Sequence, residues 1–327
     1  MRVLVTGAAG FIGSHLSEAL LERGAEVVAT DCFTEYYPRW LKELNLSEVI
    51  GHPRCRFVEG DLTELDLASL LNRVDYIFHQ AAQPGVRASW GATFECYIHN
   101  NVLATQRLLE AAKHHPIRKV VYASSSSVYG NAETYPTPEG VTPQPVSPYG
   151  VTKLAAEHLC SLYWREFSLP VVSLRYFTAY GPRQRPDMAM SRFIRAALDG
   201  CPIEIYGGGQ QSRDFTYVDD IVTANLLAAE KAPPGRIYNI GGGVEVTVNE
   251  IVRTLERQIG TLRTLRQEEG PGEARRTSAD TSLARKELGY RPRVGLEEGL
   301  TRQLGSAHRR LQPQHGLAAV RLGTGAP

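Results

Sequence analysis

Short apolar runs alternate with segments of helical periodicity through the first two-thirds of the chain. The runs predict strands at Arg2–Thr6, Glu26–Thr30, Arg56–Glu59, Tyr76–His79, Lys119–Ala123 and Val171–Tyr176. Between the first two runs, Ile12, Leu16 and Leu20 recur at the spacing of one helix face, and Gly24 suits the end of that helix. Strands that alternate with helices build βαβ units, so the pattern predicts an α/β fold with a doubly wound parallel sheet.

Two longer helices are expected in the same part of the chain. One covers Thr93–His115. The other begins near Pro148, a residue favoured in the first helical turn, with Ser147 as its N-cap. Both helices need apolar residues to cover the sheet.

The pattern changes after Phe177, where clusters of glycine and proline interrupt it. A helix at 218–231 and a strand at Arg236–Ile240 resume the alternation of helix and strand, whereas residues 241–311 mix two or three helices with loops. We therefore expect two interleaved domains. The larger comprises residues 1–177 and is rejoined by 215–240, the smaller α/β domain comprises 178–214 and 241–311, and residues 312–327 form a disordered tail.

Composition narrows the classes of function. The 327 residues are 43% hydrophobic and 22% charged, with a net charge of +1, so we expect neither a nucleic-acid-binding nor a membrane-binding surface. The N-terminus lacks the features of a signal peptide, and no run of about 18 apolar residues predicts a membrane span. The five cysteines form neither a C-x-x-C pair nor a cluster with histidine, so no metal site is expected and reduced thiols suit the cytoplasm.

A glycine-rich turn follows the first strand directly. It reads Gly7-Ala-Ala-Gly10-Phe-Ile-Gly13 and leads into a helix, an arrangement in which backbone N–H groups and the helix dipole approach a pyrophosphate. A Cβ atom would block that approach. The spacing is G-x-x-G-x-x-G and not the G-x-G-x-x-G of ordinary dehydrogenases. At the first strand-to-helix turn it predicts a Rossmann-type dinucleotide site, with Phe11 and Ile12 beside the cofactor.

Residues at the ends of the next three strands extend this site. Asp31 ends the second strand, where a carboxylate accepts hydrogen bonds from ribose hydroxyls and repels a 2′-phosphate, which favours NAD over NADP. A role as a helix cap or turn residue is the alternative. Asp61 and Leu62 follow the third strand as candidate contacts of the adenine. Ala81 and Ala82 follow the fourth and are small enough to let the cofactor pass.

Tyr149 and Lys153 are spaced to share one face of a helix. A phenol is a poor base at neutral pH, but a nearby ammonium and the positive nicotinamide ring favour phenolate, which makes Tyr149 a usable acid/base. Upstream, the serines at 124–127 close the fifth strand at the carboxyl edge of the sheet, where a hydroxyl can bridge substrate and phenolate. A serine-rich turn that satisfies its own backbone is the alternative. A Tyr-x-x-x-Lys pair is common by chance. Here it is more significant, because the glycine turn, the strand-end serines and the Tyr/Lys helix follow one another in that order.

In that order the motifs resemble the extended short-chain dehydrogenase/reductase family, in its NAD-dependent sugar epimerase/dehydratase branch, over about residues 1–300. Further matching segments are His99-Asn-Asn-Val, Leu174-Arg-Tyr-Phe and Arg213-Asp-Phe-Thr-Tyr-Val-Asp-Asp. The resemblance implies that Ser125 is the catalytic hydroxyl, that Asn100 lies near the nicotinamide or the substrate, and that Tyr176 lines the site.

The resemblance also bears on the nucleotide of the substrate. It implies that Arg213 contacts the diphosphate of a nucleotide sugar, with uridine the favoured base; from the residues alone, a surface ion pair is the alternative. Family members often carry a basic residue just before a Pro-Gly-Asp in the smaller domain. This chain departs from that pattern, since it has Glu268-Glu-Gly-Pro-Gly-Glu273, with Arg275 and Arg276 as the nearby candidates.

The loop Thr178-Ala-Tyr-Gly-Pro-Arg-Gln-Arg185-Pro-Asp-Met-Ala resembles the corresponding loop of UDP-glucuronate 4-epimerases. Arg185 offers a planar fork that can grip a sugar carboxylate, and Thr178 adds a hydroxyl; solvated loop charges are the alternative. With Ser125, Ser126 and Ser127 as further substrate contacts, the resemblance implies epimerisation of UDP-glucuronate to UDP-galacturonate at C4 through a 4-keto intermediate.

Other functions stay open. Decarboxylation of the 4-keto acid is one, although decarboxylating relatives typically carry Glu where this chain has Ser127. A UDP-glucose 4-epimerase or a nucleotide-sugar dehydratase would share the opening step. A non-catalytic NAD-sensing scaffold is opposed by the intact serine, tyrosine and lysine. The family resemblance also implies a homodimer that forms through the helices at 93–115 and 149–168.

Overall fold

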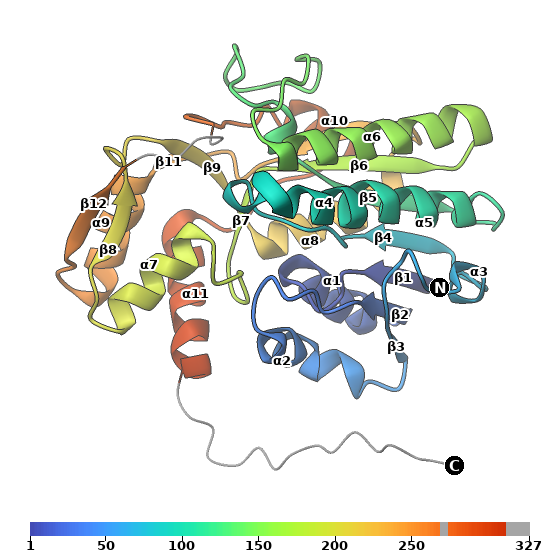
Figure 1. Ribbon diagram of the computed structural model, residues 1–327, viewed down its shortest axis with the longest axis horizontal. Helices are drawn as coiled ribbons and strands as arrows, with labels where there is room; N and C mark the ends of the chain where they lie inside the picture. Colours follow the sequence, from blue (N-terminus) through green and yellow to red (C-terminus); the bar gives the residue numbers. More distant parts are fainter. Residues whose placement is uncertain (269–273, 312–327) are drawn as a thin grey trace.

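A computed structural model describes residues 1–268 and 274–311 of the chain (Figure 1). Its centre is a parallel sheet in the strand order β10-β6-β5-β4-β1-β2-β3. The strands are β1 (Arg2–Thr6), β2 (Glu26–Asp31), β3 (Cys55–Glu59), β4 (Tyr76–His79), β5 (Lys119–Ser125), β6 (Val171–Tyr176) and β10 (Ile237–Ile240). This order confirms the predicted doubly wound sheet. It reverses between β1 and β4, and that reversal opens a crevice at the carboxyl ends of these strands.

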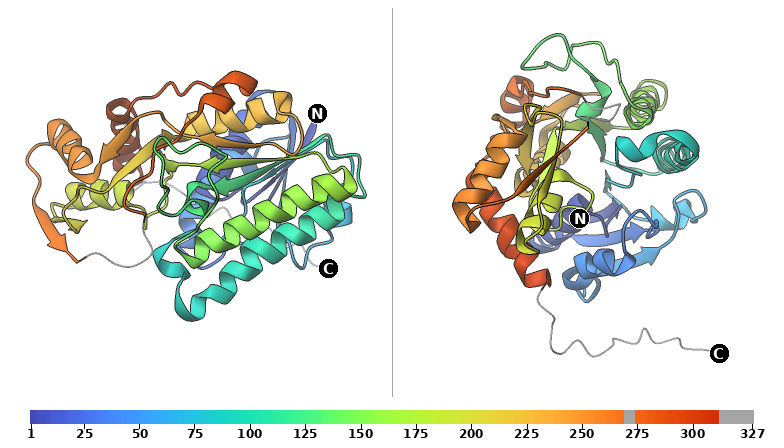
Figure 2. Two further views of the ribbon diagram at one scale, coloured as in Figure 1. Left: turned by 90° about the horizontal axis from the view of Figure 1, so that it is seen from above. Right: turned by 60° about the vertical axis from the view of Figure 1, so that its left-hand side comes forward.

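Helices cover both faces of the sheet, as Figure 2 shows from above. One face carries α1 (Phe11–Glu22), α2 (Arg39–Ile50), α8 (Val218–Lys231) and α10 (Ser282–Leu288). The other carries α3 (Leu67–Leu70), α4 (Phe94–Tyr97), α5 (Ala104–Ala112) and α6 (Pro148–Phe167). The side chains of β1 divide between the two cores: Val3 and Val5 pack toward α1, whereas Leu4 packs toward α5, and all three are fully buried. A strand that is apolar on both faces requires cover on both sides, which is typical of parallel sheets.

The helix predicted at Thr93–His115 forms in pieces and not as one regular helix. A 3₁₀ turn at Gly91–Thr93 precedes α4, and a π-helical turn at Ile98–Leu103 separates α4 from α5. The wider turn carries two successive asparagines that both meet polar groups. Asn101 is buried and its Nδ2 donates to the Thr152 hydroxyl at 2.9 Å, whereas Asn100 lines the crevice. Side-chain periodicity does not distinguish a π turn from the surrounding α-helix, and such turns are frequent at functional sites.

A smaller region lies beside the carboxyl edge of the sheet, at the left of Figure 1. Its strands form the orders β11-β9-β7 and β12-β8. Its elements are β7 (Thr178–Tyr180), α7 (Ala189–Leu198), β8 (Ile203–Tyr206), β9 (Ser212–Tyr217), β11 (Glu245–Thr247), α9 (Val248–Ile259), β12 (Thr264–Gln267) and α11 (Leu296–Leu311). The predicted helices after residue 241 are therefore confirmed as α9, α10 and α11, whereas the five short strands of this region were not predicted.

The chain returns from the smaller region to the main sheet. After β9 it enters α8, which packs on the sheet, and β10 then pairs in parallel with β6. The predicted domain boundaries stay a prediction, and the tail predicted at 312–327 lies outside the described residues. Within the described part of the chain, no helix is both long enough and apolar enough to cross a membrane.

Candidate active site

The glycine turn connects β1 to α1 at the base of the crevice. Gly7 has a φ of 67°, and a Cβ atom on it would lie 2.7 Å from the backbone nitrogen of Ala81, at the end of β4. A Cβ atom on Gly13 would lie 2.1 Å from the carbonyl oxygen of Gly7. Position 7 requires glycine because its backbone is left-handed and a Cβ atom there would clash. Position 13 requires glycine because of the clash alone. Both glycines therefore hold the start of α1 against the ends of β1 and β4.

The first turn of α1 is suited to a diphosphate. Gly10 is its N-cap and supplies no side-chain hydrogen bond, so the backbone N–H groups of Phe11 and Ile12 are not capped by a side chain of that residue. Uncapped N–H groups and the positive end of a helix dipole form an anion-binding site. This chain therefore fits a dinucleotide at the turn, held by the backbone of residues 10–13.

Asp31 stands at the end of β2 beside this turn. Its Oδ2 accepts a hydrogen bond from the Ala9 N–H at 3.0 Å, and its Oδ1 accepts one from the Phe33 N–H at 2.8 Å. Burial raises the pKa of the carboxyl, against the opposing effects of these N–H groups and of Lys42. The two backbone bonds fix the carboxylate and leave it lone pairs for the hydroxyls of a ribose.

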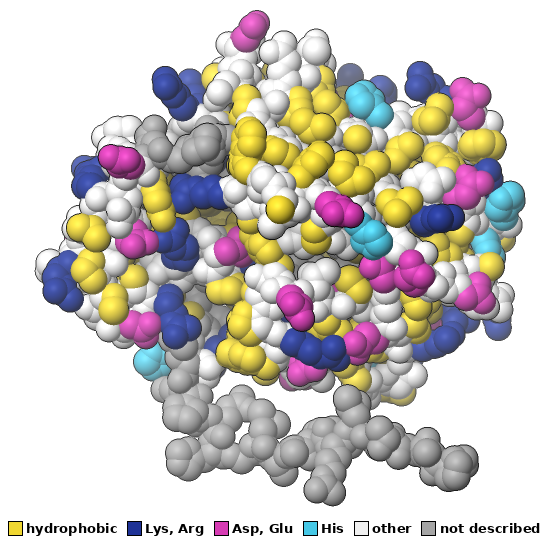
Figure 3. Space-filling model, viewed as in Figure 1, with side chains coloured by type: hydrophobic (Ala, Val, Ile, Leu, Met, Phe, Trp, Pro, Cys, Tyr) yellow, Lys and Arg dark blue, Asp and Glu magenta, His cyan; other side chains and the backbone are white. Residues whose placement is uncertain are grey.

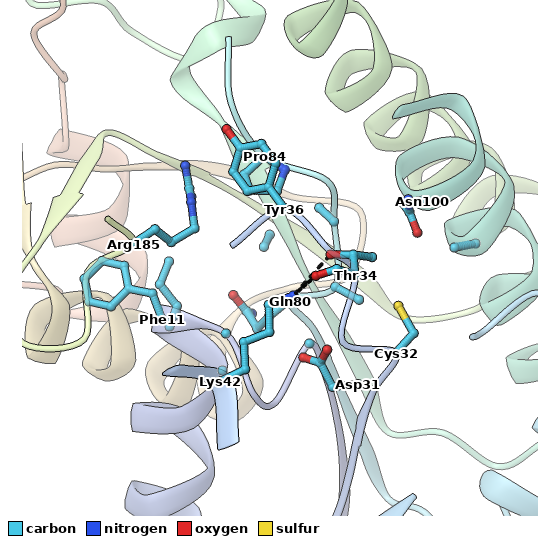
Figure 4. Close-up of a pocket in the computed structure, with 18 of the residues that line it drawn as sticks. Phe11, Asp31, Cys32, Thr34, Tyr36, Lys42, Gln80, Pro84, Asn100 and Arg185 are labelled. Carbon is cyan, nitrogen blue, oxygen red and sulfur yellow. Dashed lines mark hydrogen bonds between the residues drawn. The ribbon is translucent and has the colours of Figure 1, made fainter. Parts of the chain in front are cut away.

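Every residue predicted to bind the cofactor lines one pocket at the carboxyl edge of the sheet (Figure 4). These residues are Gly7, Gly10, Phe11, Ile12, Gly13, Asp31, Asp61, Leu62, Ala81, Ala82, Asn100, Tyr149, Lys153 and Tyr176. The pocket brings together the ends of β1 to β6, as expected for parallel strands of a doubly wound sheet. Their individual roles in binding stay predictions.

Several further residues line the same pocket without having been predicted. They are Thr30, Cys32, Thr34, Tyr36, Tyr37, Lys42, Gly60, Gln80, Pro84, Ala104, Ala123, Ser124, Ala179 and Met188. Lys42 is one of the buried charges: its Nζ donates to the Thr34 hydroxyl at 3.2 Å and so ties α2 to the loop after β2. The position of Lys42 near Asp31 in the sequence was the one signal that it lines the pocket, because Lys42 belongs to no recognisable motif.

Ser125, Tyr149 and Lys153 meet where β5 ends and α6 begins. Ser125 is the last residue of β5 and shares a hydrogen bond with the Tyr149 side chain. Burial raises the pKa of Tyr149, while the Ser125 hydrogen bond and the positive charge of Arg185 lower it. Burial also lowers the pKa of Lys153 to about 7, and the Lys153 ammonium lies 4.5 Å from the centre of the Tyr122 ring.

A capped start and a buried ion pair fix the position of α6. The predicted N-cap is confirmed, because the Ser147 hydroxyl accepts a hydrogen bond from the Gly150 N–H at 3.1 Å. Two turns after Tyr149, Glu157 accepts a hydrogen bond from Arg175 of β6 at 3.0 Å, and the two side chains are 2% and 4% exposed. Helix and sheet are thus joined beneath the side chains predicted to be catalytic.

The predicted substrate residues come from several elements. Arg185 lines the cofactor pocket from the loop between β7 and α7. Thr178 begins β7, while Ser126 and Ser127 form a 3₁₀ turn directly after Ser125. Arg213 lies in β9 of the smaller region. The contacts of these residues with a substrate stay predictions.

The segment that departs from the family pattern lies mostly outside the described residues, at 269–273. Of its two nearby arginines, Arg276 forms an ion pair with Glu245 at 2.8 Å. The backbone carbonyl of Arg275 accepts a hydrogen bond from Arg213 Nη1 at 3.3 Å. Arg213 and the 275–276 segment are therefore neighbours, as a shared nucleotide site requires.

A glycine turn at a helix N-terminus, a carboxylate at the end of β2 and a buried phenol near Arg185, all at one sheet edge, are typical of one class of enzyme. Its members transfer a hydride and a proton at a hydroxyl-bearing carbon with a nicotinamide cofactor. Within that class the match is specific, because residues 3–241 match the NAD dependent epimerase/dehydratase family. The chain belongs to this family, and its cofactor is NAD.

Individual relatives are similar over nearly the whole chain. The uncharacterized UDP-glucose epimerase YtcB of Bacillus subtilis is 46% identical over 309 residues, which cover 93% of this chain and 97% of that protein. UDP-glucuronate 4-epimerase 1 of Arabidopsis thaliana is 40% identical over 321 residues, which cover 91% of this chain and 74% of that protein. UDP-glucuronic acid 4-epimerase from Bacillus cereus, solved with UDP-glucuronic acid and NAD, matches with a TM-score of 0.93 at 44% identity, over 95% of this chain and 100% of that one.

The position of Asp31 predicts a strong preference for NAD. We expect cofactor-stripped protein to bind NAD about 100-fold more tightly than NADP at pH 8, because a buried carboxylate repels the 2′-phosphate. Asp31→Asn removes the charge and should bring the two affinities to within about 10-fold. Calorimetric titration of both cofactors measures the ratio. Asp61→Asn is the matched control in the same pocket and should leave the ratio unchanged; an unaltered preference in Asp31→Asn would contradict the assignment.

Proposed function

We propose that the protein is a UDP-glucuronate 4-epimerase, which converts UDP-glucuronate to UDP-galacturonate with bound NAD. The observation that carries the proposal is the position of Arg185. This cation lines the cofactor pocket and lowers the pKa of Tyr149, so a group shaped to bind a carboxylate acts at the predicted acid/base. Support comes from the 44% identical Bacillus cereus enzyme, which binds UDP-glucuronic acid and NAD.

Tyr149 and Ser125 handle the proton of the sugar 4-hydroxyl. The phenolate of Tyr149 accepts that proton. The Ser125 hydroxyl, which is hydrogen-bonded to Tyr149, also hydrogen-bonds the sugar 4-oxygen. When bound, NAD supplies the hydride acceptor and donor at C4. The 4-keto sugar turns over between the two transfers, and Tyr149 then returns its proton to the oxygen at C4. Protons and electrons balance over the cycle, as an isomerisation requires.

Retention of the carboxylate separates epimerisation from decarboxylation. Oxidation at C4 makes a β-keto acid, which loses carbon dioxide when the carboxylate stands perpendicular to the ketone. Ser127 occupies the position at which decarboxylating relatives carry a glutamate, and the Arg185 fork can hold the carboxylate away from that geometry. Both residues favour an epimerase that keeps its intermediate intact.

A second candidate is a UDP-glucose 4-epimerase. The name of the Bacillus subtilis relative, which is 46% identical, favours it. A neutral hexose offers no negative group for Arg185, however, so this candidate leaves the cation in the pocket without a role toward the sugar.

Removal of the Tyr149 hydroxyl tests the acid/base role. Tyr149→Phe should lower the rate of UDP-glucuronate epimerisation by about 100-fold or more, the range for loss of a positioned acid/base. Steady-state rates with NAD-loaded protein measure the effect. Tyr97→Phe is the control. The centre of the Tyr97 ring lies 6.3 Å from that of Tyr149, but the Tyr97 hydroxyl donates its hydrogen bonds to backbone carbonyls. Near-normal turnover by Tyr149→Phe would refute the assignment.

The substrate is tested by feeding UDP-glucuronate and UDP-glucose separately and identifying the products by NMR. We expect UDP-galacturonate, and we expect Arg185→Ala to lower kcat/KM for UDP-glucuronate by roughly 10- to 100-fold, the range for a hydrogen bond to a charged group. Arg195→Ala, an exposed arginine of α7, is the control.

Two results would contradict the proposed substrate. A UDP-pentose as the main product would identify a decarboxylase. Equal conversion of UDP-glucose, unaffected by Arg185→Ala, would mean that the enzyme recognises no carboxylate.

We further propose that the protein forms a homodimer through α5 and α6. Apolar side chains gather on this face, where Figure 3 shows a broad hydrophobic area. Its exposed members on the α4–α6 face include Ile98, Leu103, Val151, Leu162 and Phe167. Contiguous exposed apolar area of this kind marks protein interfaces.

The cytoplasmic location stays a prediction, and the five free cysteines are compatible with it.

Sedimentation velocity tests the dimer. Leu162→Glu places a charge in the apolar face and should convert dimer to monomer, because a buried unpaired charge is strongly unfavourable. Ile50→Glu, at a similarly exposed apolar position at the end of α2, is the control and should leave the dimer intact. A wild-type protein that sediments as a monomer would exclude the proposal.

A further inference from the structure

The loop that carries Arg185 is fastened to the cofactor half of the molecule. Arg183 forms an ion pair with Glu18 of α1 at 2.7 Å, and the carbonyl of Pro182 lies 3.0 Å from His15 Nε2, also on α1. Burial lowers the pKa of His15 to about 4, so the imidazole is neutral near pH 7 and donates this hydrogen bond. The backbone before Arg185 is thus anchored, and the direction of its guanidinium depends on its own side-chain torsions.

Asp187 restricts those torsions. The Arg185 Nε and Nη2 atoms donate to Asp187 Oδ1 and Oδ2, each at 3.0 Å, which is a two-pronged bond along one side of the guanidinium. A guanidinium has five N–H groups in a planar arrangement and can form two such forks. Asp187 takes the fork made by Nε and Nη2. The fork made by Nη1 and the second hydrogen of Nη2 remains directed away from Asp187, in the geometry that matches another carboxylate.

Tyr36 holds Asp187 from a different segment of the chain. It belongs to the loop that begins at Asp31, and its hydroxyl donates to Asp187 Oδ2 at 3.1 Å. Its ring centre lies 5.7 Å from the Arg185 guanidinium carbon, and Figure 4 shows the two side chains next to each other at one end of the pocket. Burial, followed by the negative charge of Asp187, raises the pKa of Tyr36 to about 12 against the opposing charge and hydrogen bond of Arg185, so the phenol stays neutral.

Gly85 provides the space for that hydroxyl. A Cβ atom on Gly85 would lie 2.2 Å from Tyr36 Oη, and the residue has a φ of 103°. The Tyr36, Asp187 and Arg185 side chains therefore form a packed chain of contacts with a defined place for its first member.

We infer that Asp187 and Tyr36 are positioning residues that aim the second fork of Arg185 at the sugar carboxylate and thereby set the preference for a uronate over a neutral hexose. This inference rests on the proposed UDP-glucuronate specificity. Asp187 does not compete with the sugar carboxylate for Arg185 in this arrangement, because the two carboxylates bind different forks of the guanidinium. A competing Asp187 would instead weaken binding, and the two roles predict opposite effects of its removal.

The test uses NAD-loaded protein and calorimetric titration with UDP-glucuronate, UDP-glucose and UDP. Asp187→Asn should weaken binding of UDP-glucuronate about 10-fold, and Tyr36→Phe about 3-fold, since each removes hydrogen bonds that orient the cation. Binding of UDP should stay within about twofold, because the nucleotide does not use the fork. Asp199→Asn breaks the exposed Arg195–Asp199 pair at the end of α7 and serves as the control. NAD content, measured after denaturation, verifies that each variant is intact.

Coupling to Arg185 separates positioning from a general structural role. In an Arg185→Ala background, Tyr36→Phe should have no further effect on UDP-glucuronate binding, whereas independent effects would multiply. Tighter binding of UDP-glucuronate by Asp187→Asn would overturn the inference in favour of competition. Equal weakening of all three ligands, or none, would overturn it as well.

Failure of the proposed function is recognisable in the same data. If the wild-type protein does not prefer UDP-glucuronate over UDP-glucose, or if Arg185→Ala leaves the preference unchanged, the proposed substrate and this inference are both wrong. If Arg185→Ala abolishes the preference while Asp187→Asn and Tyr36→Phe retain it, only the positioning role is wrong.

Discussion

The close approach of the glycine turn to its neighbours is the constraint on which the rest of the site depends. A Cβ atom at Gly13 would collide with the carbonyl of Gly7, and one at Gly7 would collide with the backbone of Ala81. With side chains at these positions, α1 would be displaced from the end of β1, and the N–H groups of its first turn would leave the crevice. The pocket walls, the carboxylate at Asp31 and the anchored loop at Arg183 all take their positions relative to this helix.

The proposed catalytic side chains depend on a second attachment, deep beneath them. Arg175 and Glu157 join β6 to α6 away from solvent. A buried ion pair adds little net stability, because removing two charges from water is costly, but breaking it leaves an uncompensated charge in the interior. The pair therefore strongly disfavours any shift of α6 along the sheet. Tyr149 and Lys153 stand on that helix, so its register determines whether the phenol meets Ser125.

Features encoded by local spacing were predictable from the sequence, and features created by tertiary contact were not. The glycine turn, Asp31 and the Tyr149/Lys153 helix depend on short spacings in a fixed order, and the structure gathers them at one pocket. Tyr36 has its partner, Asp187, far along the chain, and Lys42 bonds to Thr34 only because the loop after β2 folds back on α2. Nothing in their neighbouring residues reveals these partners.

The same distinction explains the missed secondary structure. Strands β7, β8, β11 and β12 are three or four residues long, too short for a clear alternation of apolar and polar positions, and β12 finds its partner β8 far along the chain. The π-helical turn at Ile98–Leu103 leaves no mark in the side-chain periodicity, and its extra residue is visible only in the backbone.

The return of the chain to the main sheet has a consequence for how the protein is made. During synthesis the first six strands leave the ribosome before β10, which follows only after the whole excursion through β7, α7, β8, β9 and α8. Until Ile237–Ile240 arrives, β6 carries an edge of unpaired backbone N–H and C=O groups, and such edges template pairing with other chains. The nascent protein thus passes through a stage at which β6, an interior and fully buried strand of the finished sheet, is an edge strand open to pairing with other chains.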